Sequence, residues 1–245
     1  MSNQQAIWSY FQHERVASFD GAYWRLERLV NYAARRHRFP AILNIGIGNG
    51  YLELLAHQRQ WAVTSVDPDA IAVDRLRARS IDARCGVIDQ LPLQSQSVDV
   101  VFASEVFEHL TPASLCAGVQ EIARVLRPGG HLFGTVPYKE NLVENECVCP
   151  NCKHIFHRWG HEQAFTAAQV RAVLEPSLNV DICEPRYFPS WKTMDLRSRI
   201  NAGLRICILN PLGIHRSNEN ILFVANKSLS KRTPNHQVYG SRADQ

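Results

Sequence analysis

Long hydrophobic runs are absent from this sequence. A helix that spans a membrane needs about 20 predominantly apolar residues, and no run of eighteen occurs here. The first residues, MSNQQAIWSYFQHE, also lack the basic segment followed by an apolar segment that marks a secretory signal. We therefore expect a protein of the cytoplasm.

Blocks of charge of one sign are absent as well. Lys and Arg number 27 against 23 Asp and Glu, and no five or six like charges follow one another. Nucleic-acid-binding domains usually carry a basic patch, so this balance argues against nucleic acid as a partner. Hydrophobic residues make up 45% of the 245 residues, which is enough for one well-packed domain but not for two large ones.

A framework of disulfides is also excluded. The seven cysteines are odd in number, and three of them fall within 147–152. The other four lie singly in apolar stretches, where a reduced cysteine behaves as a small hydrophobic residue. This usage favours a reducing compartment.

What the sequence does contain is a steady alternation of strand-like and helical patterns. Short apolar runs predict strands at 41–45, 61–67, 81–87, 98–104 and 131–137. Helical spacing predicts helices at 21–38, 70–79 and 112–126, and after residue 160 a helix at 166–174 and strands near 180–187 and 221–225. Such an alternation predicts βαβ units, and hence an α/β fold with a doubly wound, mostly parallel sheet.

Three glycines follow the first predicted strand. Gly46, Gly48 and Gly50 permit a sharp turn and a close approach of a ligand to the backbone. Their G-x-G-x-G spacing differs from the dinucleotide fingerprint, which needs its third glycine one place later. Asp67 ends the second strand about 20 residues on, where a carboxylate can accept both hydroxyls of a ribose. The pair suits an adenosine ligand that lacks a pyrophosphate.

Four blocks in order resemble the signature blocks of class I S-adenosylmethionine-dependent methyltransferases of the small-molecule type. They are ILNIGIGNGYLELLA, VTSVDPDAIAVDRLR, LPLQSQSVDVVFASEVFEHL and QEIARVLRPGGHLFGTVP, and they extend from about Ala41 to Pro137. The resemblance implies a Rossmann-like methyltransferase fold with a seven-stranded sheet, in which the final strand, Ile221–Ala225, runs antiparallel to the others. It also implies S-adenosyl-L-methionine as the cofactor.

The resemblance further implies which residues contact the cofactor. The three glycines would line its methionine half and Asp67 would hold its ribose. Asn44 stands where the family usually has an acid, and Val87 stands where it often has an Asp. The full set of expected cofactor contacts is Asn44, Gly46, Gly48, Gly50, Asp67, Ile88 and Ser104. Ile88 would pack on the adenine ring, and Ser104 follows the fourth strand at the same edge of the sheet.

His109 is the candidate catalytic base. It follows the fourth strand, and a hydroxyl acceptor needs a base to take its proton. The alternative is a structural histidine at the start of a helix. Apart from a base, methyl transfer requires mainly that the acceptor atom is held in line with the methyl carbon and the sulfur of the cofactor.

A cluster of cysteines and histidines, CVCPNCKHIFHRWGH, follows the fifth strand. Four of its residues have the spacing C-x2-C-x4-H-x3-H, which closes a tetrahedral set suited to structural Zn2+: Cys149, Cys152, His157 and His161. Cys147 and His154 make the choice of ligands ambiguous. The alternative is a metal-free loop whose His and Arg residues contact an anionic substrate.

The place of this insertion in the chain favours a role in substrate choice. The resemblance puts the wall of the acceptor pocket directly after the fifth strand, and it gives His161 a second role as an acceptor contact. Since four protein ligands leave no open position on zinc, we interpret the insertion as a metal-stapled lid and not as the reaction centre.

We expect a single methyltransferase domain over 1–228 and a disordered tail over 229–245. Its expected sections are a helical cap (1–39), the cofactor-binding core (40–137), the Cys/His insertion (139–163) and the C-terminal part of the sheet with acceptor-side helices (164–228). The expected acceptor is a small molecule or a saccharide, with O-methylation favoured over N-methylation.

Two other functions compete with this hypothesis. One is an RNA methyltransferase that stacks single strands on Trp159. The other is a catalytically silent module that binds the cofactor or zinc, which the departures at Asn44 and Val87 favour.

A last segment, Asp195–Pro211, contains apolar residues at helical spacing, interspersed with arginines. The stripe consists of Leu196, Ile200, Leu204, Ile206, Ile208 and Leu209. It predicts a core-facing helix or a homodimer contact. A peripheral contact with a membrane surface, which would admit a lipid-linked acceptor, is the alternative.

Overall fold

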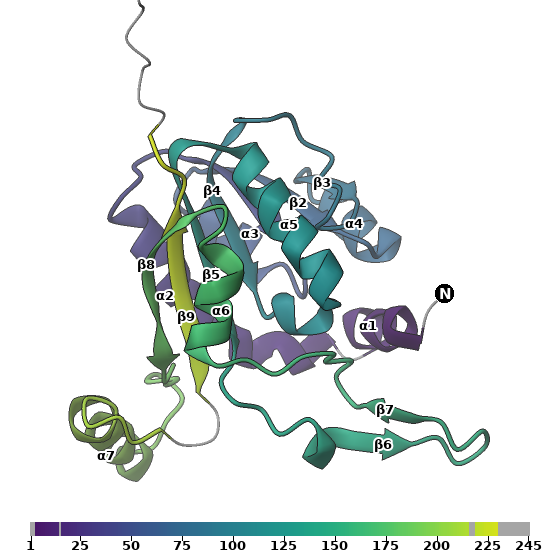
Figure 1. The fold of residues 1–245 in the computed structure, drawn as a ribbon, viewed down its shortest axis with the longest axis vertical. Coiled ribbons are helices and arrows are strands. Elements are labelled where there is room, and N and C mark those ends of the chain that lie inside the picture. The colour runs from purple at the N-terminus through teal and green to yellow at the C-terminus, as the bar shows by residue number, and fades with distance from the viewer. Residues whose placement is uncertain (1–2, 15, 216–218, 230–245) are drawn as a thin grey trace, which may run out of the picture.

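Seven strands form one sheet at the centre of the computed structural model, which describes residues 3–14, 16–215 and 219–229 (Figure 1). In spatial order they are β3 (Asp82–Cys85), β2 (Ala62–Asp67), β1 (Ala41–Ile45), β4 (Val98–Ser104), β5 (Leu126–Pro137), β9 (Asn220–Asn226) and β8 (Asn179–Arg186). Neighbouring strands pair in parallel except β9, which is antiparallel to both β5 and β8. The predicted fold class is confirmed, including its reversed final strand.

Helices cover both faces of the sheet, which explains the apolar runs of its central strands. Residues 100–103 of β4 are completely buried. One face of the sheet packs with α5 (Pro112–Val125) and α6 (Ala167–Leu174), and the other packs with α2 (Tyr23–Ala34) and α3 (Tyr51–His57). A smaller cluster seats α4 (Ala70–Arg77) beside β3. Strands buried on both faces read as continuous hydrophobic sequence.

Local sequence signals set where several helices begin. Thr111 caps α5 by accepting a hydrogen bond from the Ser114 amide at 3.2 Å, and Pro112 follows it. Thr166 forms a capping box with Gln169 at the start of α6. The helix predicted over 21–38 is shorter than expected, because Val16–Ala22 form a 3-10 helix, η1, and α2 ends at Ala34.

The Cys/His insertion forms a hairpin that projects from the body of the protein (Figure 1). After the short 3-10 helix η3 (Val143–Asn145), β6 (Glu146–Val148) pairs antiparallel with β7 (Ile155–His157). The first helix, α1 (Asn3–His13), lies beside this hairpin, and the rings of Phe11 and Trp159 are 4.9 Å apart. Two segments far apart in the sequence therefore meet on one side of the sheet.

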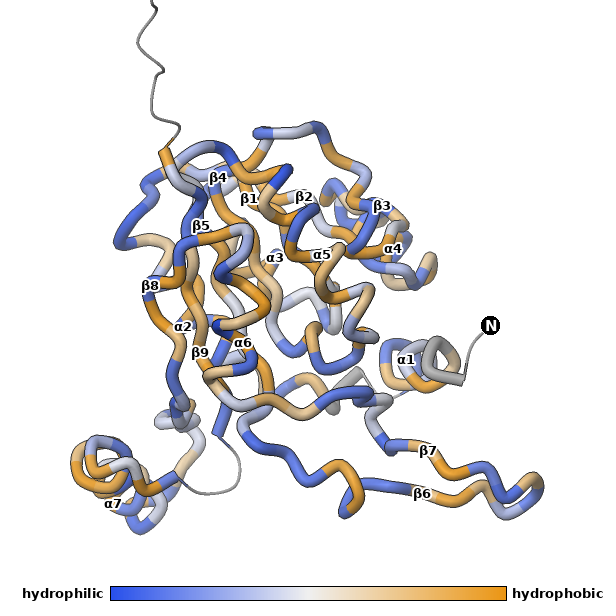
Figure 2. The backbone as a smooth tube through the Cα atoms, viewed as in Figure 1, coloured by the Kyte–Doolittle hydropathy of each residue, from blue (hydrophilic) through white to orange (hydrophobic). Residues whose placement is uncertain are grey.

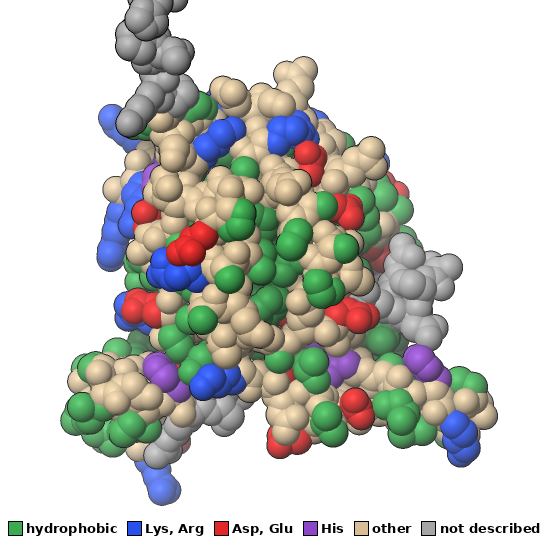
Figure 3. All heavy atoms as spheres, viewed as in Figure 1, with side chains coloured by type: hydrophobic (Ala, Val, Ile, Leu, Met, Phe, Trp, Pro, Cys, Tyr) green, Lys and Arg blue, Asp and Glu red, His purple; other side chains and the backbone are tan. Residues whose placement is uncertain are grey.

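The segment predicted to face the core does not do so. Residues Leu196–Leu204 form α7, followed by a π-helix, η4 (Arg205–Leu209), and the whole segment stands apart from the sheet as a largely apolar coil (Figure 2). Exposed apolar side chains gather over it (Figure 3): Leu196, Ile200, Leu204, Ile208, Leu212 and Ile214. Only Ala202 of α7 is buried, so the core-facing interpretation is wrong. The dimer contact stays a prediction.

Two other expectations concern the ends and the membrane. The predicted tail lies outside the described residues except for Leu229. Within the part of the chain that is described, no helix combines the length and the apolar character required to cross a bilayer.

Replacing Gly134 by Ala should destabilise the sheet. A Cβ atom at this position in β5 would lie 2.2 Å from Cζ of Phe223 and 2.3 Å from the carbonyl oxygen of Ala103. We expect Gly134→Ala to lower the free energy of unfolding by about 1–3 kcal/mol or more, as overpacking does. Urea denaturation measures this. The matched control is Gly203→Ala, where a Cβ would meet nothing within 4 Å; an equal loss in both variants would contradict the argument.

Candidate active site

The glycine turn lies between β1 and α3, at the carboxyl edge of the sheet. Gly46, Gly48 and Gly50 all have positive φ (84°, 54° and 82°), a conformation that other residues adopt only with strain. The Gly46 amide donates to the carbonyl of Val66 at 2.9 Å, which ties the turn to β2. Gly50 is the N-cap of α3. The sequence thus folds here into a turn that exposes backbone to a ligand.

Asp67 ends β2 directly against this turn. Its side chain accepts hydrogen bonds from the amides of Ile47 at 2.8 Å and Asp69 at 2.9 Å. The residue is buried, and burial raises the pKa of its carboxyl despite these bonds. The amide of Gln12, from α1, lies 3.3 Å from both carboxylate oxygens. The predicted ribose contact, Asp67, is therefore next to the glycines. Its carboxylate is hydrogen-bonded to Gln12, a residue that the sequence analysis did not identify.

Asn44 faces a buried carboxylate. Its Nδ2 donates to Oε1 of Glu53 at 2.7 Å, and the Ser65 hydroxyl donates to the same oxygen at 2.6 Å. Glu53 is completely buried, its Oε2 has no partner, and burial raises the pKa of its carboxyl. The acid missing at position 44 thus has a counterpart in α3. Sequence reasoning missed Glu53, although it is the one acid in the otherwise apolar run YLELLA.

Two other predicted cofactor residues have different surroundings. Ile88 is buried in the core against Gly118 of α5, so its side chain packs on a helix, whereas Val87 is exposed. The Ser104 hydroxyl lies 2.9 Å from that of Thr135 and accepts from Nε of Arg25 at 3.2 Å. The Gly86 amide, two residues before Ile88, donates to the Asp67 carbonyl at 3.1 Å, so this segment lies beside Asp67. The cofactor contacts of Ile88 and Ser104 stay predictions.

His109 lies in a buried environment that makes it a weak base. Burial, with the nearby His161 ring as a second cause, lowers the pKa of His109 to about 3. Its Nδ1 lies 3.1 Å from the Gly160 carbonyl oxygen and 3.1 Å from Nε1 of Trp8, which donates to it. A general base acts best when its pKa is near the working pH. The structure thus does not favour His109 as the base.

The structure does not assemble the predicted four-residue zinc set. The Cys149 amide donates to the His154 carbonyl at the tip of the hairpin, whereas His157 pairs with Glu146 at its base. Three residues of strand separate these positions. Among the described residues, no group of potential ligand atoms within 4.8 Å of one another contains a cysteine. The four-residue zinc set stays a prediction.

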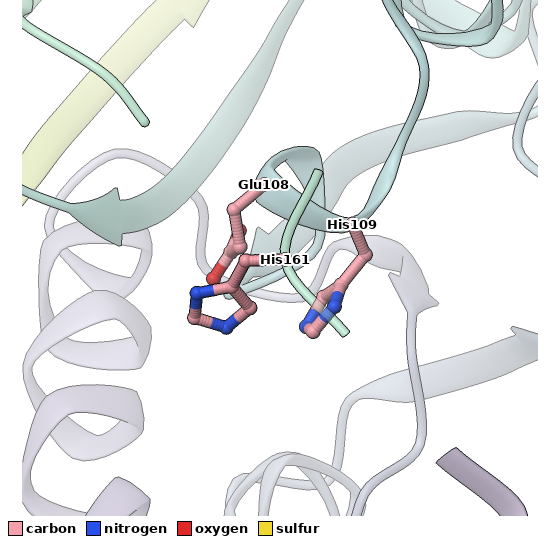
Figure 4. A group of neighbouring side chains, drawn as sticks. All are labelled: Glu108, His109 and His161. Atoms are coloured by element: carbon pink, nitrogen blue, oxygen red, sulfur yellow. The ribbon is translucent and has the colours of Figure 1, made fainter. Parts of the chain in front are cut away.

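The predicted histidine ligands instead join acids from other segments. Among the described residues two groups have potential ligand atoms within 4.8 Å of one another: Glu108, His109 and His161, and Glu140, His157 and His161. Figure 4 shows the Glu108 carboxylate beside the His161 ring, with the His109 ring next to them. Neither group contains a cysteine. No sequence signal distinguished Glu108 or Glu140.

Helix α1 links this cluster to the glycine turn. Trp8 donates to His109 and Gln12 donates to Asp67. These two residues are four positions apart, so they stand one helical turn, about 6 Å, from each other along the helix. The Asp67 carboxylate and the His/Glu cluster are therefore neighbours along the same edge of the sheet.

The buried Glu53 predicts a pH effect on stability. A carboxyl whose pKa is raised on folding stabilises the native state below its unfolded value, about 4.5, and this contribution is lost as pH rises through the folded pKa. Glu53→Gln keeps the acceptor oxygen but cannot ionise. The difference in unfolding free energy, variant minus parent, should rise with pH from about 4.5 and then level off, by about 1.4 kcal/mol per unit of raised pKa. Urea titrations across pH measure it; a flat difference would contradict the argument.

Comparison with known proteins agrees with this geometry. Residues 43–134 match the family described as a methyltransferase domain. A probable S-adenosylmethionine-dependent methyltransferase of Mycolicibacterium smegmatis is 37% identical over 119 residues, 47% of this chain and 46% of that protein. The malonyl-[acyl-carrier protein] O-methyltransferase of Serratia marcescens is 33% identical over 141 residues, 55% of this chain and 54% of that protein. The chain thus spans about half the length of these curated relatives.

Solved structures share the fold. The 1,6-didemethyltoxoflavin-N1-methyltransferase of Burkholderia thailandensis, bound to 1,6-didemethyltoxoflavin and S-adenosylhomocysteine, has a TM-score of 0.64 at 15% identity, over 92% of this chain and 87% of that one. At this identity the likeness concerns the fold alone. Residues 43–134 thus match the family described as a methyltransferase domain, and the chain has the Rossmann-like fold of methyltransferases.

Proposed function

We propose that this chain transfers the methyl group of S-adenosylmethionine to a hydroxyl of a small-molecule or sugar-containing acceptor. The observation that carries the proposal is the buried Asp67 carboxylate, bound by the amide of Ile47 within the glycine turn at 2.8 Å. A carboxylate held in this way at the end of β2 can accept both ribose hydroxyls of an adenosine ligand.

Cofactor binding requires a change in α1. Both oxygens of Asp67 are within 3.3 Å of the Gln12 amide, so ribose hydroxyls compete with Gln12 for the same acceptors. Arg75 holds this part of α1 through a hydrogen bond to the Gln12 carbonyl at 2.8 Å, and it also contacts the Gly48 carbonyl. We therefore interpret α1 as a lid over the cofactor edge.

The transfer itself consists of one displacement. The acceptor oxygen forms a bond to the methyl carbon while the bond from that carbon to sulfur breaks, leaving S-adenosylhomocysteine and a methyl ether. The hydroxyl proton passes to solvent water, and the rate depends chiefly on holding oxygen, carbon and sulfur in line. Glu108, His109 and His161 are neighbours of Asp67 through α1, and they offer acceptors for a hydroxyl.

The hairpin and α1 form the wall on the acceptor side. A groove between them is lined by Ala6, Ile7, Tyr10, Phe11, Cys147, Phe156 and Arg158. Aromatic faces of this kind suit the ring of a sugar or an aromatic acceptor. The Serratia relative is named for O-methylation of malonyl-[acyl-carrier protein], which supports transfer to oxygen. The Burkholderia neighbour is named for N1-methylation of 1,6-didemethyltoxoflavin, so it is an example of a small-molecule acceptor on this fold and not of transfer to oxygen.

The alternative of a catalytically silent cofactor-binding module is less well supported than the sequence suggested. It was based partly on the absence of an acid at position 44. Glu53 supplies a carboxylate 2.7 Å from the Asn44 side chain. We therefore favour the enzyme.

Replacing Asp67 by Asn should weaken cofactor binding. The change removes the charge that accepts two hydroxyls, and hydrogen bonds to charged groups contribute about 1.5–3 kcal/mol. We expect S-adenosylhomocysteine to bind about 10- to 100-fold more weakly by calorimetry. The matched control is Asp74→Asn, on the exposed face of α4, which should bind as the parent does. Unchanged affinity in Asp67→Asn would overturn the ribose assignment.

Removing the Gln12 side chain should strengthen cofactor binding. Gln12→Ala ends the competition for Asp67, and a hydrogen bond contributes roughly 0.5–1.5 kcal/mol, so we expect S-adenosylhomocysteine to bind about 2- to 10-fold more tightly. Gln58→Ala, at an exposed position after α3, serves as the control. Weaker binding in Gln12→Ala would instead make Gln12 a cofactor contact.

A further inference from the structure

Glu108 is a buried carboxylate whose oxygens have no side-chain partner. It lies in the 3-10 helix η2 (Phe107–His109), its residue is 1% exposed, and neither oxygen has a hydrogen-bond partner beyond its own backbone amide. Glu105 and Glu140 add negative charge nearby. Arg25 also lies near, but it donates to Ser104 at 3.2 Å and lies 3.9 Å from Glu105. A buried carboxyl in such a place either stays protonated or pairs with a cation or a metal ion.

Two imidazoles stand beside this carboxylate. His109, Glu108 and His161 each offer a ligand atom within 4.8 Å of the other two. Ligands of a tetrahedral zinc ion lie roughly 3.3 Å apart, since each is about 2.0–2.2 Å from the metal. Side-chain movements of about 1 Å would therefore bring the three together around an ion.

Each imidazole also has the outer partner that a metal ligand usually has. Nδ1 of His161 contacts the Glu140 carboxylate and must donate to it, which leaves Nε2 as the ligand atom. Nδ1 of His109 lies 3.1 Å from the Gly160 carbonyl and accepts from Nε1 of Trp8 at 3.1 Å. When Trp8 withdraws, Nδ1 can donate to the Gly160 oxygen, which makes Nε2 the ligand atom. Metal-binding histidines almost always donate their second ring N–H to a carboxylate or a carbonyl in this way.

The second group, around His157, is less suited to a metal. Nδ1 of His157 accepts from the amides of His161 at 3.1 Å and Trp159 at 3.4 Å. Its Nε2 must then carry the proton, and it points at Glu140 at 3.5 Å. A protonated nitrogen has no lone pair to give. Glu140 also accepts from Asn145 at 3.0 Å, so this group is a hydrogen-bonded support for His161.

We propose that Glu108, His109 and His161 bind one divalent transition-metal ion, zinc being the best fit, with Glu140 and the Gly160 carbonyl orienting the two imidazoles. Two histidines and one carboxylate form a three-ligand zinc site that keeps an open position. The cysteines at the hairpin tip take no part in it.

The role of the ion rests on the proposed function. A hydroxyl that enters the open position loses its proton to solvent more readily, because the ion stabilises the oxygen anion. That oxygen then forms the bond to the methyl carbon as the carbon–sulfur bond breaks. Trp8, in α1, donates to Nδ1 of His109, and the same nitrogen must donate to Gly160 when an ion is bound. Nδ1 cannot do both, so metal binding breaks the hydrogen bond to Trp8 and favours the release of α1.

Cobalt(II) titration of the chelator-treated full chain tests the site. We expect equimolar binding with visible absorption of a nitrogen and oxygen site, and without the near-ultraviolet thiolate band that cysteine ligands give. Glu108→Gln and His161→Gln should each abolish equimolar binding. Glu140→Gln, which removes only an orienting group, should weaken it about 10- to 100-fold.

Matched controls remove potential ligands outside the site. The double variant Cys149→Ser with Cys152→Ser, and His154→Gln at an exposed position of the hairpin, should bind cobalt as the parent does. Circular dichroism identifies any variant that fails to fold, and at least one of the two ligand variants must fold for the comparison. Loss of binding in the cysteine variant, a thiolate band, or parent-like binding in a folded Glu108→Gln or His161→Gln would overturn the proposal, as would no binding by the parent.

Titration with S-adenosylhomocysteine on the same preparation separates the two proposals. Metal binding without cofactor binding would support the metal site and overturn the proposed methyl transfer. Cofactor binding without metal binding would support the proposed methyl transfer and overturn the metal site. The acceptor site would then work without a metal.

Discussion

The hydrogen bonds from the Ile47 and Asp69 amides to the Asp67 carboxylate hold the candidate site together. They fix the end of β2 against the glycine turn after β1, and they keep a carboxylate in place where burial raises its pKa. Parallel strands bring their carboxyl ends to one edge of the sheet, so acids and glycines from separate segments meet there. The same edge receives η2 after β4, and with it Glu108 and His109.

A second feature of the site is that two of its acids are buried with carboxyl oxygens that lack hydrogen-bond partners. Glu53 and Glu108 both retain buried oxygens without partners, and the pKa of each carboxyl is raised, chiefly by burial. Such groups lower stability unless a ligand or an ion completes them. Two incomplete acids on one edge of a sheet are therefore typical of a binding site.

The sequence predicted the scaffold better than the site. Strand periodicity, the caps at Thr111 and Thr166 and the ordered motif blocks each depend on local residues, and the sheet follows from them. The pairing of Gln12 with Asp67, or of Glu140 with His161, joins segments 55 and 21 positions apart. No periodicity encodes such pairs. The exposed stripe of α7 shows the same limit, because apolar spacing predicts a face but not what covers it.

The Cys/His segment shows that spacing in the sequence does not fix which side chains lie together. Cys149 and His157 have the intervals of a zinc set, but they lie towards opposite ends of strand β7 in the hairpin. His161 lies beyond the hairpin, where a loop returns it to Glu140 and Glu108. The ligand set that geometry favours therefore combines residues from two segments, η2 and the loop after the hairpin.

The central claim is that the Asp67 edge binds an adenosine cofactor. Calorimetric titration of the unaltered chain with S-adenosylhomocysteine tests it most directly. The account predicts saturable, equimolar binding that adenine alone does not reproduce, since the ribose and the amino-acid half supply contacts to Asp67 and the glycine turn. No detectable binding, or equal binding of adenine alone, would contradict it.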